Sequence, residues 1–212
     1  MRRRRDADAM YSDAEGDLAV RMAREAIESV TRGRAVPSFS VPASFERESG
    51  VFVTINTYPE EELRGCIGYP SPFFALAKAI LKAAEGATED PRFPRLAEEE
   101  LDRVVVEVSV LTPPEQIVVR KPKELPGHVR LGTDGLIAAQ GRTRGLLLPQ
   151  VAVAYGWDAA EFLSQTCTKA GLLPAAWFDP ETRIYRFQSE IFAEAEPRGP
   201  VVRRVLPAHA RP

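Results

Sequence analysis

Histidine and cysteine are scarce in this sequence, with two residues of each among 212. The two cysteines, Cys66 and Cys167, are too few for a disulfide framework and lack the spacing of metal ligands. One of the histidines, His209, lies almost at the end of the chain, so a zinc site would have few nitrogen ligands. The sequence therefore predicts that the protein holds no metal.

Long apolar runs are also missing. No stretch approaches the ~18 apolar residues of a membrane-spanning helix, so we expect no membrane association. The residues after Arg2–Arg5 are polar and acidic, unlike the apolar centre of a secretory signal. We therefore expect a cytoplasmic protein. Asn56 is the only asparagine, and together with 18 prolines and 27% charged residues this favours a thermophilic source.

Common nucleotide, hydrolase and thioredoxin motifs are absent as well. The chain has no GxGxxG segment, no P-loop and no CxxC pair, and it offers no Ser–His–Asp pattern. We therefore expect no cofactor.

The formal net charge of −2 is unevenly distributed, because both ends of the chain are basic. Residues 1–11 and 197–212 each contribute four arginines, whereas acids outnumber bases between them. We interpret the two ends as basic, disordered tails that flank one domain at 12–196. An acidic body matches a phosphate backbone poorly, so nucleic-acid binding is expected only through the tails.

The apolar pattern predicts an α+β protein. Ser12 and Glu15 form a capping box in front of a helical apolar spacing that ends near Gly33. The β-branched run Val51–Ile55 predicts a strand, and Ser71-Pro72 predicts the start of a helix. Further strands are predicted over Leu63–Tyr69, Val104–Val110, Arg130–Leu131, Gly135–Gln140, Gly145–Leu148 and Arg183–Ala193, and a further helix after Asp158.

The segment Leu63–Tyr69 combines a cysteine, an arginine and two glycines. Side chains alternate between the faces of a strand, so Arg64, Cys66 and Gly68 are expected on one face and Gly65 on the other. The two glycines would let a ligand come close to the sulfur. A guanidinium beside the thiol would favour the reactive thiolate and give Cys66 a pKa below that of a free thiol.

Several motifs of the chain occur in the order found in a known family. They are Leu63–Gly68, Asp90–Phe93, Val106–Leu111, Gly145–Val151, Gly156–Asp158 and Lys169–Gly171. With these motifs the chain resembles, over roughly residues 13–196, the AMMECR family, named after a human chromosomal region linked to Alport syndrome, midface hypoplasia and elliptocytosis. The resemblance implies a two-lobed α+β fold, with a larger antiparallel sheet, flanking helices and a smaller, mostly β lobe.

The resemblance also implies a working centre around Cys66, toward a cleft between the two lobes. Relatives are often encoded beside, or fused to, Memo-type proteins and radical-SAM enzymes, so such proteins are the expected partners. Many relatives carry Gly-x-His-Gly where this chain has Gly132-Thr133-Asp134-Gly135. If that histidine acts as a base elsewhere, Asp134 has to replace it here.

The catalytic candidates are Cys66, Glu107 and Asp134. Cys66 is either a nucleophile or a small buried core residue. Arg64 either clamps an anionic substrate group or forms a structural ion pair with Glu107. Glu107 interrupts a valine strand, where a carboxylate needs a partner or water, and it shares with Asp134 the predicted role of moving protons.

The candidates for substrate binding are Arg64, Gly65, Gly68, Asp90, Arg92 and Gln150. Asp90 and Arg92 could equally fix the loop that contains them. Gln150 could cap a short helix instead of reaching a ligand. Cys167 lies on the apolar face of a predicted helix, which favours core packing, whereas closeness to Cys66 would make a redox pair.

Three functions are open on this basis. The first is an enzyme, or enzyme component, that holds a small or peptidyl substrate in the cleft with the thiol at its centre. The second is a non-catalytic module that docks a Memo-like or radical-SAM partner. The third is nucleic-acid binding through the basic tails.

Overall fold

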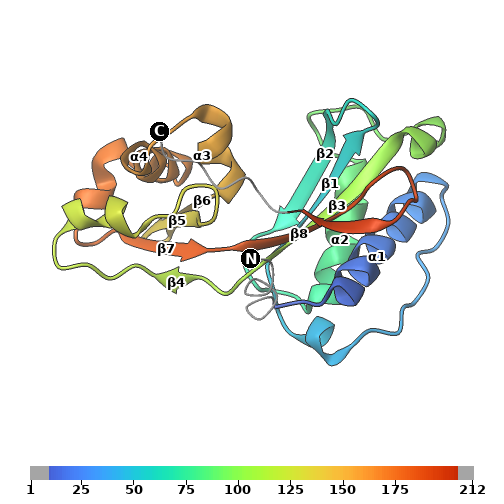
Figure 1. The fold of residues 1–212 in the computed structure, drawn as a ribbon, viewed down its shortest axis with the longest axis horizontal. Coiled ribbons are helices and arrows are strands. Elements are labelled where there is room, and N and C mark those ends of the chain that lie inside the picture. Colours follow the sequence, from blue (N-terminus) through green and yellow to red (C-terminus); the bar gives the residue numbers. More distant parts are fainter. Residues whose placement is uncertain (1–9, 205–212) are drawn as a thin grey trace, which may run out of the picture. The chain divides into compact units, whose positions relative to one another are not determined.

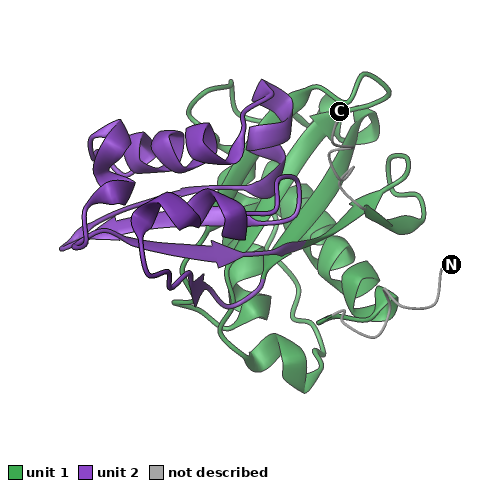
Figure 2. Ribbon diagram, turned by 60° about the vertical axis from the view of Figure 1, so that its left-hand side comes forward, with its two compact units in different colours: residues 1–111, 190–205 green, residues 112–189, 206–212 purple. Residues whose placement is uncertain are grey.

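The computed structural model describes residues 10–204 and divides them into two compact units. Unit 1 contains residues 10–111 and 190–204, and unit 2 contains residues 112–189 (Figure 2). Each unit has its own hydrophobic core and its own antiparallel sheet. The predicted α+β fold is therefore confirmed.

The elements of unit 1 are α1 (Asp13–Thr31), β1 (Val51–Thr57), β2 (Leu63–Tyr69), α2 (Leu76–Thr88), β3 (Val104–Leu111), β8 (Ser189–Glu194) and β9 (Val201–Arg204), with the short 3-10 helices η1 (Ala43–Glu46) and η2 (Glu98–Arg103). The strand order in the sheet is β2-β1-β3-β8-β9, so β2 is an edge strand. The helices α1 and α2 pack on the same face of this sheet (Figure 1).

The capping box predicted at the start of α1 is confirmed. The Ser12 hydroxyl accepts a hydrogen bond from the Glu15 amide at 3.3 Å, and the Glu15 carboxylate accepts one from the Ser12 amide at 2.8 Å. The apolar stripe that follows is buried, for example at Met22, and packs in the same core as Val53 of the sheet. The local sequence therefore fixes both where α1 begins and which face it buries.

The start predicted for the second helix at Ser71-Pro72 is wrong, because α2 begins at Leu76. Ala75 has extended backbone and forms a β-bridge with Glu48, so the helix cannot continue further toward the N-terminus. Phe73, which follows the predicted start, lies outside the helix and is 74% exposed.

The folded domain extends beyond both predicted boundaries, residues 12 and 196. Tyr11 is buried and packs edge-on against Phe45, with the ring centroids 6.1 Å apart. At the other end, β9 pairs with β8, and the Arg203 guanidinium binds Asp13 at 2.9 Å and Glu190 at 3.1 Å. These pairings hold residues that were assigned to a disordered tail. The remaining parts of both basic tails, residues 1–9 and 205–212, lie outside the described residues.

The elements of unit 2 are β4 (Glu115–Gln116), β5 (Gly135–Gln140), β6 (Thr143–Leu147), α3 (Pro149–Tyr155), α4 (Ala159–Lys169) and β7 (Arg183–Phe187), with the 3-10 helices η3 (Pro122–His128) and η4 (Pro174–Phe178). The strand order is β4-β7-β5-β6. Asp158 caps α4 as predicted, because its side chain accepts a hydrogen bond from the Glu161 amide at 2.8 Å.

Two strands predicted in this region differ from the structure. Arg130–Leu131 is not a strand, since the Arg130 amide and guanidinium both bind the Asp134 carboxylate in a turn. The strand predicted over residues 183–193 is interrupted at Gln188, which separates β7 from β8. The Gln188 amide donates to the Thr112 hydroxyl at 2.8 Å instead of to a neighbouring strand of the ladder.

No helix within residues 10–204 combines the length and the apolar character that crossing a bilayer requires. The cytoplasmic location stays a prediction.

A buried ion pair joins α1 to the sheet of unit 1. The Arg24 guanidinium binds both carboxylate oxygens of Glu194, and its Nε lies 2.9 Å from Oε1. The same guanidinium donates to the Val104 carbonyl at 2.7 Å, and the Glu194 carboxylate accepts from the Val106 amide at 2.9 Å. Both side chains are more than nine-tenths buried, so each charge depends on the other for compensation.

We expect Arg24→Met to lower the free energy of unfolding by about 3–5 kcal/mol, because it leaves the Glu194 charge buried without its partner. Urea unfolding followed by circular dichroism measures the change. The double variant Arg24→Met/Glu194→Gln should lose less than the single variant, since it buries no charge. A double variant less stable than Arg24→Met would contradict this account.

Candidate functional site

Cys66, Thr54 and Glu107 form a row across β2, β1 and β3, and we call these three residues the thiol row. Thr54 is paired directly with Cys66 on one side and with Glu107 on the other. Residues directly opposite each other in a sheet point to the same face. This face is the one opposite α1 and α2, because Val53 and Ile55 of β1 point into the helix-covered core. The Thr54 hydroxyl donates to the Cys66 sulfur at 3.3 Å.

The main chain of Cys66 is held by two side chains at the open edge of β2. Its amide donates to Asp90 Oδ2 at 2.9 Å, and its carbonyl accepts from Arg92 Nη2 at 3.3 Å. Asp90 in turn accepts from the Arg92 amide at 3.0 Å and pairs with the Arg92 guanidinium at 2.7 Å. We call this arrangement the Asp90–Arg92 clasp. It satisfies the edge groups that a strand at this position leaves unpaired.

Asp90 carries its charge in a buried position. The residue is 2% exposed, yet the hydrogen bonds from Arg92 and from the Cys66 amide hold the pKa of its carboxyl well below the usual range. The carboxylate therefore stays ionised at neutral pH. Of the two interpretations open for Asp90 and Arg92, the contacts support the one in which they fix the loop.

The glycines beside Cys66 do not leave room for a ligand, contrary to our prediction. The alternation itself is as predicted, with Gly65 on the helix-covered face and Gly68 on the other. A Cβ on Gly65 would meet the Ala87 carbonyl oxygen at 2.3 Å, and a Cβ on Gly68 would meet the Phe52 ring at 2.2 Å. Protein atoms therefore fill the space next to both glycines, so they serve close packing.

Arg64 does not pair with Glu107, which corrects a second prediction. The pairing of β1 with β2 shifts between Ile55 and Asn56, and this irregularity removes Arg64 from the regular alternation. Its guanidinium instead binds Glu100 of η2 through two hydrogen bonds, of 2.7 and 2.9 Å. The Arg64 guanidinium is therefore already engaged in a two-point ion pair within the fold.

The thiol of Cys66 is harder to ionise than a free thiol, so the predicted direction was wrong. Burial raises the pKa of the Cys66 thiol, while the hydrogen bond from Thr54 and the Arg92 guanidinium act in the opposite direction. The arginine near the sulfur is thus Arg92 and not Arg64. The Arg92 guanidinium does lower the pKa of the thiol, but the loss of hydration on burial raises it by more.

Glu107 is paired with an arginine that the sequence placed in a tail. Arg204 of β9 lies with its Nε 3.9 Å from the Glu107 carboxylate and binds Glu61 at 2.9 Å. Burial raises the pKa of the Glu107 carboxyl, Arg204 opposes this and Glu61 adds to it. Within residues 10–204 no hydrogen bond to this carboxylate is found. A half-buried carboxyl of raised pKa with a loose partner is typical of a functional group.

The other two candidates belong to unit 2. Asp134 is fully buried and binds Arg130 through the amide at 3.0 Å and the guanidinium at 2.8 Å. Gln150 does not cap α3, and its Oε1 is buried without a hydrogen-bond partner among the described residues. Cys167 is buried in the core of unit 2, as its helical position predicted, and both cysteines are free thiols.

Four residues of the site were missed by sequence reasoning. Thr54 could have been found, because the predicted strand places it at an alternate position between Val53 and Ile55. Glu61, Glu100 and Arg204 reach the site through contacts distant in sequence, for which the chain carries no local signal.

Known proteins with the same motifs were identified by sequence and by structure. The model of the AMMECR1 family matches residues 20–192. A protein of Thermococcus gammatolerans is 53% identical over 200 residues, which cover 92% of this chain and 97% of that protein. Protein MJ0810 of Methanocaldococcus jannaschii is 51% identical over 193 residues, or 91% of this chain and 96% of that protein.

The crystal structure of protein PH0010 from Pyrococcus horikoshii has the same fold. It matches with a TM-score of 0.83 at 48% identity, covering 92% of this chain and 98% of that one. These relatives come from thermophiles. The family resemblance inferred from the motifs is therefore confirmed.

We expect Cys66 to be alkylated by iodoacetamide with a pH midpoint above that of a free cysteine, because burial disfavours its thiolate. Rates would be measured by mass spectrometry in the Cys167→Ser background. Thr54→Val should move the midpoint further up, since the hydroxyl no longer stabilises the charged sulfur. A midpoint below that of free cysteine would show that the burial argument is wrong.

We expect Asp90→Asn to lower the free energy of unfolding at pH 7 by about 1–3 kcal/mol, because it removes the charge from the clasp. The folded-state pKa of Asp90 lies below the ordinary carboxyl value of 3.8, so its contribution is present above that value and is lost as the pH falls below it. Urea unfolding at several pH values should therefore show the wild type and variant converging in acid. A difference that stays constant into acid would contradict the assignment.

Proposed function

The chain belongs to the AMMECR1 family, and from that premise we propose that it acts as an enzyme, or as a component of one, whose reacting group is the Cys66 thiol. Its substrate is a small molecule or a peptide with an electrophilic carbon, held on the face of the unit 1 sheet that carries the thiol row. The observation that carries this proposal is the loosely paired Glu107 carboxyl of raised pKa on the same face as the thiol.

The clasp supports a role that requires a fixed sulfur. Two side chains bind the main chain of Cys66, and the Thr54 hydroxyl binds its sulfur, so the residue is held from three sides. A cysteine that only fills space needs no hydrogen bond to its sulfur. Holding a reacting atom in place before the substrate arrives is what a nucleophile needs.

Glu107 supplies the base that a protonated thiol requires. Since the pKa of the thiol is raised, Cys66 is protonated at neutral pH and has to lose a proton in order to attack. A carboxyl whose pKa is also raised is a stronger base than an ordinary one. Glu107 lies two strands from Cys66, about 10 Å at the usual strand spacing, so the thiol proton reaches it through a polar group of the bound substrate.

Thr54 and Arg92 complete the proposed site. The Thr54 hydroxyl donates to the sulfur, which is the direction that stabilises the thiolate once the proton has left. The Arg92 guanidinium binds Asp90 through Nε and Nη2, and its side chain is 56% exposed, so Nη1 is the donor that can meet an anionic group of the substrate. Arg92 thereby offers a single donor and not the two-point clamp that the sequence suggested for Arg64.

The raised pKa of the thiol also favours a second candidate function. A thiol that stays protonated could belong to a non-catalytic module, which docks a Memo-like or radical-SAM partner on the same face. This alternative requires that partner binding is unaffected by Cys66→Ser, whereas the enzymatic function requires the sulfur.

A peptide thioester tests the proposed chemistry. We expect the folded protein to form an acyl adduct at Cys66 near neutral pH, detected by intact-mass spectrometry. Glu107→Gln should slow adduct formation about 100-fold, because the amide accepts no proton. Cys167→Ser is the matched control and should react at the wild-type rate, since Cys167 is buried in the other unit.

Two results would overturn the proposal. One is labelling of Cys66 only after unfolding, which would remove the nucleophile. The other is a Glu107→Gln variant that reacts as fast as the wild type, which would remove the base. Capture of a Memo-like partner by both the wild type and Cys66→Ser, without any adduct, would establish the binding module instead.

A further inference from the structure

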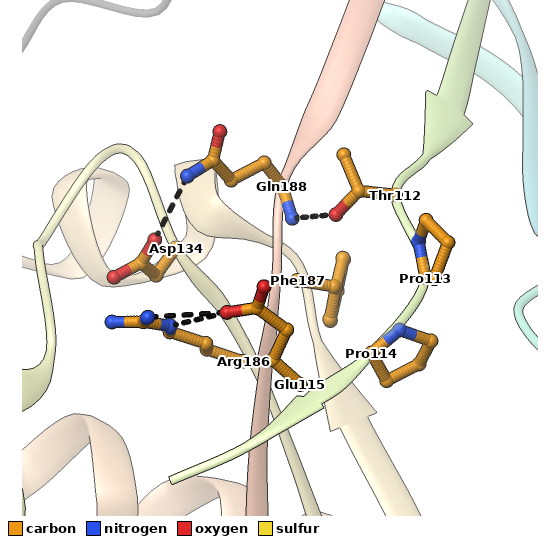
Figure 3. Close-up of a pocket in the computed structure, with 8 residues that line it drawn as sticks. All are labelled: Thr112, Pro113, Pro114, Glu115, Asp134, Arg186, Phe187 and Gln188. Carbon is orange, nitrogen blue, oxygen red and sulfur yellow. Dashed lines mark hydrogen bonds and ion pairs between the residues drawn. The ribbon is translucent and has the colours of Figure 1, made fainter. Parts of the chain in front are cut away.

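Unit 2 contains a pocket of about 300 Å³ that the thiol chemistry does not use. It is lined by residues 112–115, by residues 186–188 and by Asp134 (Figure 3). All of these residues belong to unit 2. We call this pocket the proline slot. Its volume lies at the lower end of the range for ligand sites, which suits a small metabolite-sized molecule.

The slot exists because two prolines interrupt a strand ladder. At one end, Thr112 and Gln188 are joined by two hydrogen bonds of 2.8 Å. At the other end, Glu115 of β4 is paired with Arg186 of β7. Between them lie Pro113-Pro114, which have no amide hydrogen to donate, so the two segments separate. The proline rings form one wall of the opening (Figure 3).

The rim of the slot carries one positive and one negative side chain that are free to exchange partners. Arg186 binds Glu115 at 3.1 Å, and the two side chains are 36% and 71% exposed. An ion pair this exposed contributes little to stability, so a ligand can replace either partner without large loss. The pair therefore places a guanidinium and a carboxylate, both accessible to a ligand, on one side of the slot (Figure 3).

The inner carboxylate of the slot is already neutralised. Asp134 binds the Arg130 guanidinium, and the Gln188 amide nitrogen lies 3.5 Å from it. With this inner pair balanced, the lining has no net charge beyond the Glu115–Arg186 pair. A purely anionic ligand would compete with Glu115 for Arg186, and a purely cationic one would compete with Arg186 for Glu115. A molecule that carries both charges satisfies both rim groups at once.

We propose that the proline slot binds a free α-amino acid. The ligand carboxylate takes the Arg186 guanidinium, the ligand ammonium takes the Glu115 carboxylate, and an apolar ligand side chain lies against Pro113-Pro114. Binding opens the Glu115–Arg186 pair and replaces it with two charge-assisted contacts of the same type. The slot shares no residue with the thiol row, so neither proposal depends on the other.

Leucine and two analogues that each lack one charged group test this proposal. The analogues are 3-methylbutylamine, without the carboxylate, and 4-methylpentanoate, without the ammonium. Glycine, proline and lysine extend the amino-acid panel. Binding is followed by amide chemical shifts of Thr112 and Gln188 in the full chain. We expect at least one amino acid to bind at a single site, with leucine at least about tenfold tighter than either analogue.

Variants of the rim pair separate the two contacts. Arg186→Gln should weaken leucine binding about tenfold without weakening 3-methylbutylamine, which no longer competes with Arg186 for Glu115. Glu115→Gln should likewise weaken leucine binding about tenfold without weakening 4-methylpentanoate, which no longer competes with Glu115 for Arg186. Arg183→Gln is the matched control, because Arg183 is an exposed arginine of the same strand outside the slot. Circular dichroism confirms that each variant is folded.

Three results would overturn the proposal. They are no shifts with any of the four amino acids at tens of millimolar, equal binding by Arg186→Gln and the wild type, and equal affinity for leucine and its one-charge analogues. Cys66→Ser should bind leucine like the wild type, so a failure of the thiol chemistry is distinguishable from a failure of this site.

Discussion

The buried carboxylate of Asp90 is the constraint on which the candidate site depends. It binds the Cys66 amide and the Arg92 side chain together, at the edge where β2 has no further strand to pair with. Without that charge the edge groups of Cys66 would face solvent, and the sulfur would lose its fixed place beside Thr54. A single ionised group thus links the loop after α2 to the position of the thiol.

The rest of unit 1 keeps the opposite face of the sheet available for polar residues. The helices α1 and α2 bury the apolar side chains of β1 and β3, and the Arg24–Glu194 pair attaches α1 to the sheet. The polar row is therefore not needed for the core. Its groups carry the usual signs of function, because the thiol and the Glu107 carboxyl both sit where burial opposes their charged forms.

Local patterns in the sequence predicted much of this, and contacts distant in sequence explain what they missed. Strand alternation correctly separated Gly65 from Cys66, and the capping residues Ser12 and Asp158 marked two helix starts. The predicted partner of Arg64 was wrong, because the strand pairing is irregular at Ile55 and takes Arg64 out of the regular alternation. Likewise, the arginines of residues 197–212 favoured a basic tail, yet β9 adds to the sheet and brings Arg204 to Glu107. Strand pairing of this kind depends on tertiary structure, which no local window contains.

The titration of Glu107 tests the central claim most directly. Carbon-13 NMR of the side-chain carboxyl measures it in the wild type and in Arg204→Gln. The account predicts a wild-type pKa above the ordinary value of 4.5, and a higher one in the variant, because the opposing guanidinium is lost. A wild-type pKa at or below 4.5 would mean that Glu107 is an ordinary solvated carboxylate, and the thiol row would lose its base.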